Sequence, residues 1–242
     1  MSDKLSPGIF TKNTTINAMT ANADSLPTSD TVAESSSDSQ EVAVQAGARK
    51  RPKPGERRVQ ILQALASMLE QPGAERVTTA ALAARLAVSE AALYRHFASK
   101  AQMFEALIDF IEQSVFGLVN QLGERESDAT ARCRKLVTLL LQFGERNPGM
   151  TRVMVGDALV FEHERLQHRM NLFFDKIESA LRQDLREAAS RAGLATPSVN
   201  AQASASVVSA FCVGRLQRYA RSGFKRLPSE NLEHSLALLL PS

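Results

Sequence analysis

The stretch from Thr78 to Lys100 constrains the fold of this chain most, because its pattern predicts two short helices joined by a tight turn. In the first helix the apolar residues recur at the spacing of one helical face: Ala80, Leu82, Ala83 and Leu86. Thr78 or Thr79 can cap this helix, because a threonine hydroxyl accepts an unpaired backbone N–H at a helix start.

The second helix is predicted over residues 89–97. Ser89 is its expected N-cap, and Leu93 and Phe97, four residues apart, are expected to face inward. A helix–turn–helix of this kind occurs both in DNA-binding proteins and in helical hairpins with no such role. The spacing alone leaves these two alternatives open.

The outward side chains of the second helix favour DNA. Small residues near its start allow the backbone to enter a major groove, and Tyr, Arg and His one turn later can reach phosphates. Lys100 lies where the next helix begins, so its ammonium and that helix's first N–H groups could share a phosphate. The candidate DNA-contacting residues are Thr78, Thr79, Ser89, Glu90, Ala91, Ala92, Tyr94, Arg95, His96 and Lys100.

The segment LAVSEAALYRHFASKAQMFEAL resembles the DNA-binding domain of TetR-family regulators, over roughly residues 56–118. The resemblance implies that residues 89–97 form the recognition helix. It also implies that Thr79, Tyr94, His96 and Lys100 are phosphate-contacting positions.

The composition agrees with an all-α protein of two domains. The chain has 242 residues, of which 44% are hydrophobic but only 5% aromatic, with no Trp, which suits Leu- and Ala-rich helices. We expect a tail without fixed structure at 1–48, a basic arm at 49–55, a three-helix DNA-binding domain at 56–118 and a helical dimerisation domain at 119–242. Cys133 and Cys212 match no metal or redox spacing and are expected to be buried.

Charge is distributed unevenly along the chain. Residues 1–48 hold two lysines against six acidic residues, a net of −4; since the whole chain carries +3, the rest carries +7. Six of the ten residues from Arg49 to Arg58 are basic and one is acidic. A basic cluster ahead of a helix–turn–helix suits an arm that follows the DNA backbone or the minor groove, although a solvated linker would have the same composition.

Helical periodicity and helix-breaking residues divide the remainder. The expected helices cover residues 55–71, 100–122, 129–146, 150–160, 162–192, 196–221 and 228–240. The helices at 162–192 and 196–221 have broad apolar faces, which favour a homodimer that places two DNA-reading helices on one palindrome. The alternative is that these faces belong to the core of a monomer.

A second candidate site lies near the end of the helix at 129–146. Leu139, Gln142 and Arg146 fall on one helical face, and Asn147 follows at the helix end. A groove beside an exposed Arg could hold an acidic peptide. Favourable interaction of a cation with the helix dipole would explain Arg146 equally well.

Several segments, FGERNPGMTR and ALVFEHERLQHRMNLFF among them, resemble the nucleoid occlusion factors within the TetR family. The resemblance implies a cytoplasmic, nucleoid-associated homodimer that binds palindromic chromosomal sites in double-stranded DNA. On DNA it would bind the division protein FtsZ, disrupt FtsZ polymers and keep the septum off the nucleoid, without a small-molecule ligand. The alternative is a ligand-responsive TetR-type transcriptional repressor, whose core domain would enclose a pocket between Leu136 and Ile177.

Other functional classes find little support. No catalytic constellation or glycine-rich phosphate loop stands out, so we expect neither an enzyme nor a cofactor. Glu164 and His168 have a metal-compatible spacing but lack further ligands, so we expect no metal site. No apolar run approaches the ~20 residues that a membrane-spanning helix requires, and no signal peptide is visible at the N-terminus.

Overall fold

The computed structural model of the chain describes residues 55–71 and 76–240. The expected tail at 1–48, all of the basic arm except Gly55, and the expected helix stop at Pro72-Gly73 lie outside these ranges. Every regular element within the described ranges is helical. The prediction of an all-α fold is therefore confirmed.

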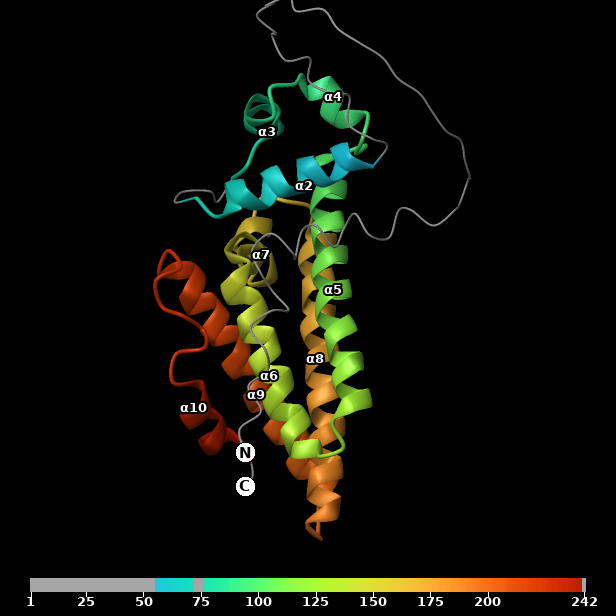
Figure 1. The fold of residues 1–242 in the computed structure, drawn as a ribbon, viewed down its shortest axis with the longest axis vertical. Coiled ribbons are helices and arrows are strands. Elements are labelled where there is room, and N and C mark those ends of the chain that lie inside the picture. The colour runs from blue at the N-terminus through green and yellow to red at the C-terminus, as the bar shows by residue number, and fades with distance from the viewer. Residues whose placement is uncertain (1–54, 72–75, 241–242) are drawn as a thin grey trace, which may run out of the picture.

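A headpiece of short helices forms one end of the molecule (Figure 1). It comprises α2 (Glu56–Leu69), α3 (Thr79–Arg85), α4 (Glu90–Tyr94) and the first turns of α5 (Lys100–Arg125). Its core is made of side chains that are each about 1% exposed, drawn from all four helices and the turn after α4: Ile61, Leu65, Leu82, Leu93, Phe97 and Phe104.

The core domain is a bundle whose long helices run roughly parallel to the molecular axis (Figure 1). α6 (Ala129–Arg146) lies among its neighbours and is lined with fully buried residues, as expected for a central helix. The other elements are α7 (Pro148–Met154), η1 (Asp157–Leu159), α8 (Glu164–Arg191), α9 (Pro197–Arg221) and α10 (Leu232–Leu239).

Local sequence signals explain most of the helix ends. The Asp128 carboxylate accepts the Ala131 N–H at 2.7 Å at the start of α6, and Pro197 occupies the first turn of α9. Gly193 has a φ of 70° after α8, and Leu194 N–H donates to the Ala189 carbonyl at 3.1 Å. This is the left-handed helix end that the sequence predicts.

Several helix bounds and one stripe residue differ from expectation. α7 begins at Pro148, two residues before the expected start, and α8 begins at Glu164, two residues after it. α4 ends at Tyr94 rather than Phe97, and α5 continues through Gly123 to Arg125. The expected helix at 150–160 is split, since Gly156 takes a φ of 84° and η1 follows. α10 begins at Leu232 after a turn that starts at Pro228. Ala80 is exposed, so it does not belong to the buried stripe of α3.

The two domains pack directly against each other. α5 crosses the expected domain boundary at residue 118 without interruption. A β-carbon added to Gly149 of α7 would lie only 2.1 Å from the Ala66 carbonyl oxygen of α2. Glycine is therefore required where these helices approach, and it fixes the headpiece on the core domain.

Both cysteines are fully buried. Burial raises the pKa of the Cys133 thiol to about 12, and burial likewise raises the pKa of Cys212 to about 12. These thiols are structural side chains, as the sequence predicts, rather than nucleophiles.

Candidate DNA-binding interface

Side-chain caps begin both helices of the pair α3–α4, and a backbone bond closes the turn between them. Thr78 Oγ1 accepts the Ala81 N–H and Ser89 Oγ accepts the Ala92 N–H, both at 3.2 Å. Between them Ala87 has a φ of 53°, a left-handed conformation that few residues other than Gly adopt. Val88 N–H donates back to the Ala83 carbonyl at 3.0 Å and closes the turn.

The inner side of α4 and of the turn after it is anchored to α2. Leu93 and Phe97 are each 1% exposed, as predicted. The Arg58 guanidinium lies 4.1 Å from the centre of the Phe97 ring and donates a hydrogen bond to the His96 carbonyl. Arg58 thus joins α2 to the turn after α4, both by cation–π contact and by satisfying a terminal carbonyl.

The outer side of α4 presents several of the predicted DNA-contacting side chains. Tyr94 is 46% exposed. Arg95, Glu90 and Ala91 are also exposed, whereas Ala92 and His96 are half-buried. A small-residue patch beside an exposed aromatic and a guanidinium can follow a DNA groove and its flanking phosphates.

Thr79 and Glu90 contact each other across the turn. The Thr79 hydroxyl donates to Glu90 Oε2 at 2.5 Å. This bond ties the first turn of α3 to the first turn of α4. Glu90 therefore helps to position α3 against α4 within the candidate interface. The sequence spacing of Thr79 and Glu90 does not predict this role.

Lys100 has a partner that the sequence does not predict. Its ammonium forms an ion pair with Glu162, which lies in the segment just before α8 of the core domain. Ser99 does cap α5 as predicted, accepting the Gln102 N–H at 3.2 Å. An anion at the start of α5 would therefore meet a Lys100 that already pairs with a carboxylate.

At the second candidate site the structure separates Asn147 from the other three residues. Leu139, Gln142 and Arg146 are half-buried on α6. Asn147 is only 8% exposed, and its side-chain amide donates to the Phe143 carbonyl at 2.8 Å. Its side chain therefore closes the end of α6 and is not part of an exposed surface.

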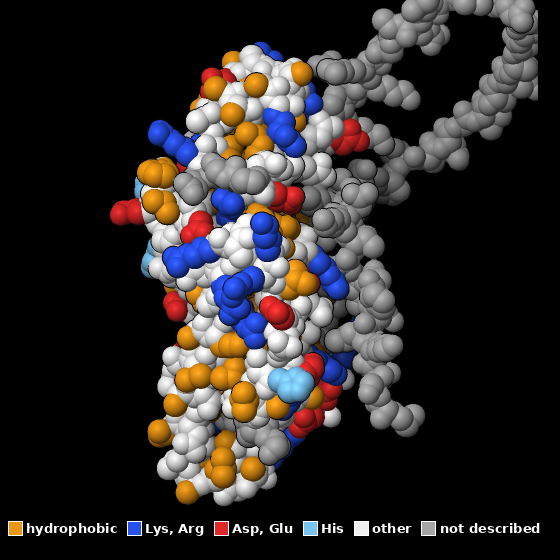
Figure 2. Space-filling view, turned by 90° about the vertical axis from the view of Figure 1, so that its left-hand side faces the viewer, with side chains coloured by type: hydrophobic (Ala, Val, Ile, Leu, Met, Phe, Trp, Pro, Cys, Tyr) orange, Lys and Arg blue, Asp and Glu red, His pale blue; other side chains and the backbone are white. Residues whose placement is uncertain are grey.

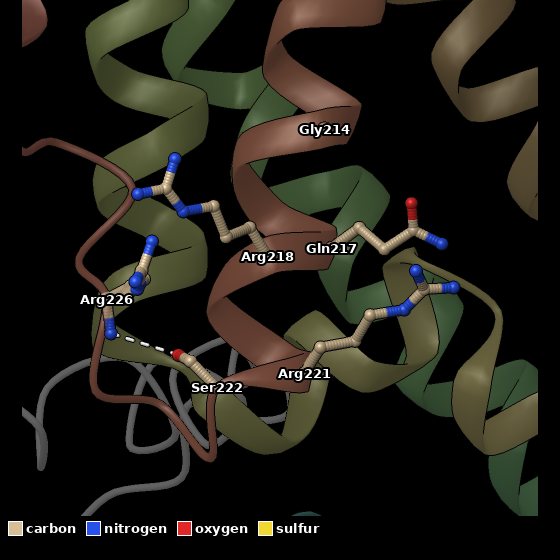
Figure 3. A pocket seen from close by; sticks show the side chains of 6 residues that line it. All are labelled: Gly214, Gln217, Arg218, Arg221, Ser222 and Arg226. Carbon is tan, nitrogen blue, oxygen red and sulfur yellow. Dashed lines mark hydrogen bonds between the residues drawn. The ribbon is translucent and has the colours of Figure 1, made fainter.

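A further basic region lies where α9 ends. Figure 2 shows Lys and Arg side chains gathered across the middle of one face of the molecule, with hydrophobic side chains below them. A depression of about 370 Å³ at the end of α9 is lined by Gly214, Gln217, Arg218, Arg221, Ser222 and Arg226. In Figure 3 Arg218 and Arg226 lie on one side of α9, and Gln217 and Arg221 on the other. The guanidinium groups therefore do not converge on one point.

Two further features bear on the expectations from sequence. Within residues 55–71 and 76–240, no group of three or more His, Cys, Asp or Glu is arranged to hold a metal ion. Among the helices of the same ranges, none is long and apolar enough to cross a bilayer.

Comparison with known proteins identifies the family. Residues 61–107 match the bacterial regulatory proteins of the tetR family. Residues 127–241 match the SlmA-like C-terminal domain of tetracyclin repressor-like proteins. The chain is 52% identical to the nucleoid occlusion factor SlmA of Photobacterium profundum over 76% of this chain and 93% of that protein. The chain belongs to the SlmA family.

Relatives from other bacteria agree with this assignment. The SlmA protein of Escherichia coli O1:K1 is 52% identical over 73% of this chain and 89% of its own length. The SlmA protein of Vibrio cholerae is 51% identical over 76% of this chain and 93% of its own length. The resemblance to TetR-family nucleoid occlusion factors is thereby confirmed.

Solved structures of more distant proteins share the fold. The TetR-family regulator PfmR of Thermus thermophilus aligns with a TM-score of 0.60 at 18% identity, over 76% of this chain and 96% of its own. FadR of Bacillus subtilis, solved in complex with stearoyl-CoA, aligns with a TM-score of 0.59 at 13% identity, over 75% and 96%. These similarities establish the TetR-like arrangement of helices.

Sequence reasoning did not identify two residues of the interface, Arg58 and Glu162. The sequence indicates Arg58 only as one of the basic residues from Arg49 to Arg58. Its contact with Phe97 joins residues far apart in sequence. Glu162 lies 62 positions from Lys100, and it precedes α8 rather than beginning that helix as expected. Only the tertiary structure brings such pairs together.

Proposed function

We propose that this protein is a nucleoid occlusion factor that binds palindromic DNA as a symmetric dimer and inhibits FtsZ assembly while on DNA. The observation that carries the DNA-binding part is the doubly capped pair α3–α4, which presents Tyr94 and Arg95 outward on a helix anchored by Leu93. Membership of the SlmA family supports the role in nucleoid occlusion.

The exposed face of α9 supports the dimer. Val199 and Val207 are 68% and 55% exposed. Small residues lie between and beyond them on the same side of the helix, which allows a second helix to approach closely: Ala203, Ala210 and Gly214. On α8, which packs against α9, Leu172 is 43% exposed. A two-fold pairing of these helices would bury this apolar surface and place two headpieces on one duplex.

The FtsZ surface is proposed on α6, around Leu139, Gln142 and Arg146. These residues combine half-buried apolar surface with a guanidinium at a helix end. Such a surface can accept an extended acidic segment, with Arg146 pairing a carboxylate. Asn147 is left out of this surface because its side chain faces the protein.

Light scattering of FtsZ assembly tests this proposal. With palindromic DNA present, the wild-type protein should suppress FtsZ assembly more strongly than without DNA. Arg146→Asp should retain DNA affinity and lose the suppression, whereas Arg134→Asp on the same helix should behave as wild type. Equal FtsZ assembly with and without the protein–DNA complex would refute the proposed role.

The alternative, a ligand-responsive repressor, requires a cavity between residues 136 and 177. Val137, Leu140, Phe173 and Ile177, which would line it, have no surface accessible to water. A cavity of ligand size would leave part of such side chains exposed to its interior. Packing of these described residues therefore favours the first function.

A further inference from the structure

The ion pair between Lys100 and Glu162 connects the two domains at the edge of the candidate DNA interface. Lys100 is the first residue of α5, immediately beyond the Ser99 cap. Glu162 lies in the segment between η1 and α8. The side chain of Lys100 is 24% exposed, but that of Glu162 is only 9% exposed.

Because of this difference in burial, Glu162 depends on the ion pair more than Lys100 does. Lys100 can turn toward solvent, where an ammonium is well hydrated. Glu162 has Lys100 as its ion-pair partner, and a carboxylate buried without a partner is strongly unfavourable. If Lys100 moves to a phosphate, Glu162 must therefore move toward water.

We propose that Glu162 competes with DNA phosphate for Lys100, so that DNA binding releases residues 160–162 from the headpiece. This inference rests on the proposed DNA binding and deepens it. Glu162 is then a positioning residue that holds Lys100 and lowers DNA affinity. The release of residues 160–162 is the change by which DNA binding acts on the core domain.

The segment that would be released carries two exposed apolar side chains. Val160 and Phe161 are 70% and 65% exposed. The Phe161 ring centre lies 5.8 Å from the guanidinium of Arg76, which precedes α3. The segment thus contacts the headpiece at two points, Lys100 and Arg76, and exchange of Lys100 removes the stronger of them.

A neighbouring ion pair at the same junction provides a matched control. Arg165 at the start of α8 pairs with Glu105 of α5 at 2.8 Å. It joins the same two parts of the molecule, but neither of its residues belongs to the candidate DNA interface. Glu105→Gln therefore removes one negative charge from the junction without releasing Lys100.

The first test is DNA affinity of the full chain on a palindromic duplex, measured by fluorescence anisotropy at several salt concentrations. Glu162→Gln should bind about three- to tenfold more tightly at low salt, because Lys100 no longer exchanges partners. Glu105→Gln should gain less than about twofold from the lost charge. Adding Lys100→Ala to Glu162→Gln should abolish the gain.

The second test reports on the loop itself. The chain has no Trp, so Phe161→Trp introduces a single tryptophan at the segment in question. Its emission should shift when DNA is added, and the shift should disappear when Lys100→Ala is also present, at DNA concentrations that still saturate binding. Thermal unfolding of each variant verifies that it is folded.

The outcomes separate this inference from the function on which it rests. A wild-type protein that binds no duplex refutes the proposed function. A wild-type protein that binds DNA, with Glu162→Gln binding no more tightly than Glu105→Gln or less tightly than wild type, refutes only the competition between Glu162 and phosphate. Tryptophan emission of the Phe161→Trp variant that DNA does not change refutes the release of the loop.

Discussion

At the scale of single residues, short polar side chains define the DNA-reading unit. Thr78, Ser89 and Ser99 each accept a backbone N–H at 3.2 Å, and each begins a helix of the unit. These caps could be predicted from sequence because each bond spans only three residues. The pairing of Lys100 with Glu162 could not, because it depends on the packing of two domains.

The Ser89 cap has a measurable contribution to stability. Ser89→Ala should lower the free energy of unfolding by about 1 kcal/mol, because the first turn of α4 loses its acceptor. It should weaken DNA binding as well, since α4 has only five residues and little else to order its start. Urea unfolding and anisotropy measure the two effects.

Ser179→Ala is the matched control for Ser89→Ala. Ser179 is exposed in the middle of α8, where alanine favours the helix by a few tenths of a kcal/mol. If Ser89→Ala were as stable as this control and bound DNA normally, the cap would not order the recognition helix.

At the scale of elements, periodicity predicted the long helices well and the short ones poorly. α6 has the expected bounds, because its apolar face and Asp128 cap are local signals. α4 stops at Tyr94 although the expected helix ran to Phe97. The N–H groups of His96 and Phe97 donate to the Leu93 carbonyl and close the turn that follows. Arg58 of α2 adds a hydrogen bond to the His96 carbonyl, which no local pattern reveals. The left-handed backbone conformation of Ala87 could not be predicted either, because Gly is the residue that usually adopts it.

Gly149 illustrates how a local reading misses a tertiary role. α6 ends at Arg146, where Asn147-Pro148-Gly149 predicts a helix end. The next helix was expected from residue 150, but Pro148 begins α7 and Gly149 lies within it. Its function is to let α7 approach the backbone of α2. The contact that fixes the headpiece on the core domain therefore depends on the absence of one β-carbon.

Gly149→Ala should destabilise the protein by about 1–3 kcal/mol, because the new β-carbon meets the Ala66 carbonyl and the helices must separate. Gly117→Ala is its control: nothing lies within 4 Å of that position in α5, and alanine should stabilise the helix by about 0.5–1 kcal/mol. Equal thermal shifts for the two variants would show that the α2–α7 contact is not tight.

At the scale of the whole molecule, binding of a palindrome requires two copies of the chain. The sequence predicts broad apolar faces on the helices at 162–192 and 196–221, and the structure places exposed Val199 and Val207 on α9. A sequence cannot specify which residues meet a second copy, because the same periodicity also builds a monomer core.

Val207→Asp should convert the dimer to a monomer and lower affinity for a palindrome by about 100-fold or more. A monomer binds with one headpiece only and loses the gain in affinity that a second, linked headpiece provides. Light scattering coupled to size-exclusion chromatography measures the mass. Leu238→Asp, on α10 and 89% exposed, should leave the mass unchanged. A dimer that persists in Val207→Asp would place the interface elsewhere.

A genome-wide map of the sites that this protein occupies in its own cell tests nucleoid occlusion most directly. Many palindromic sites should be occupied across the chromosome and become sparse near the replication terminus, and occupancy should be lost in Tyr94→Ala. A single site beside one promoter would contradict nucleoid occlusion and indicate a local repressor instead.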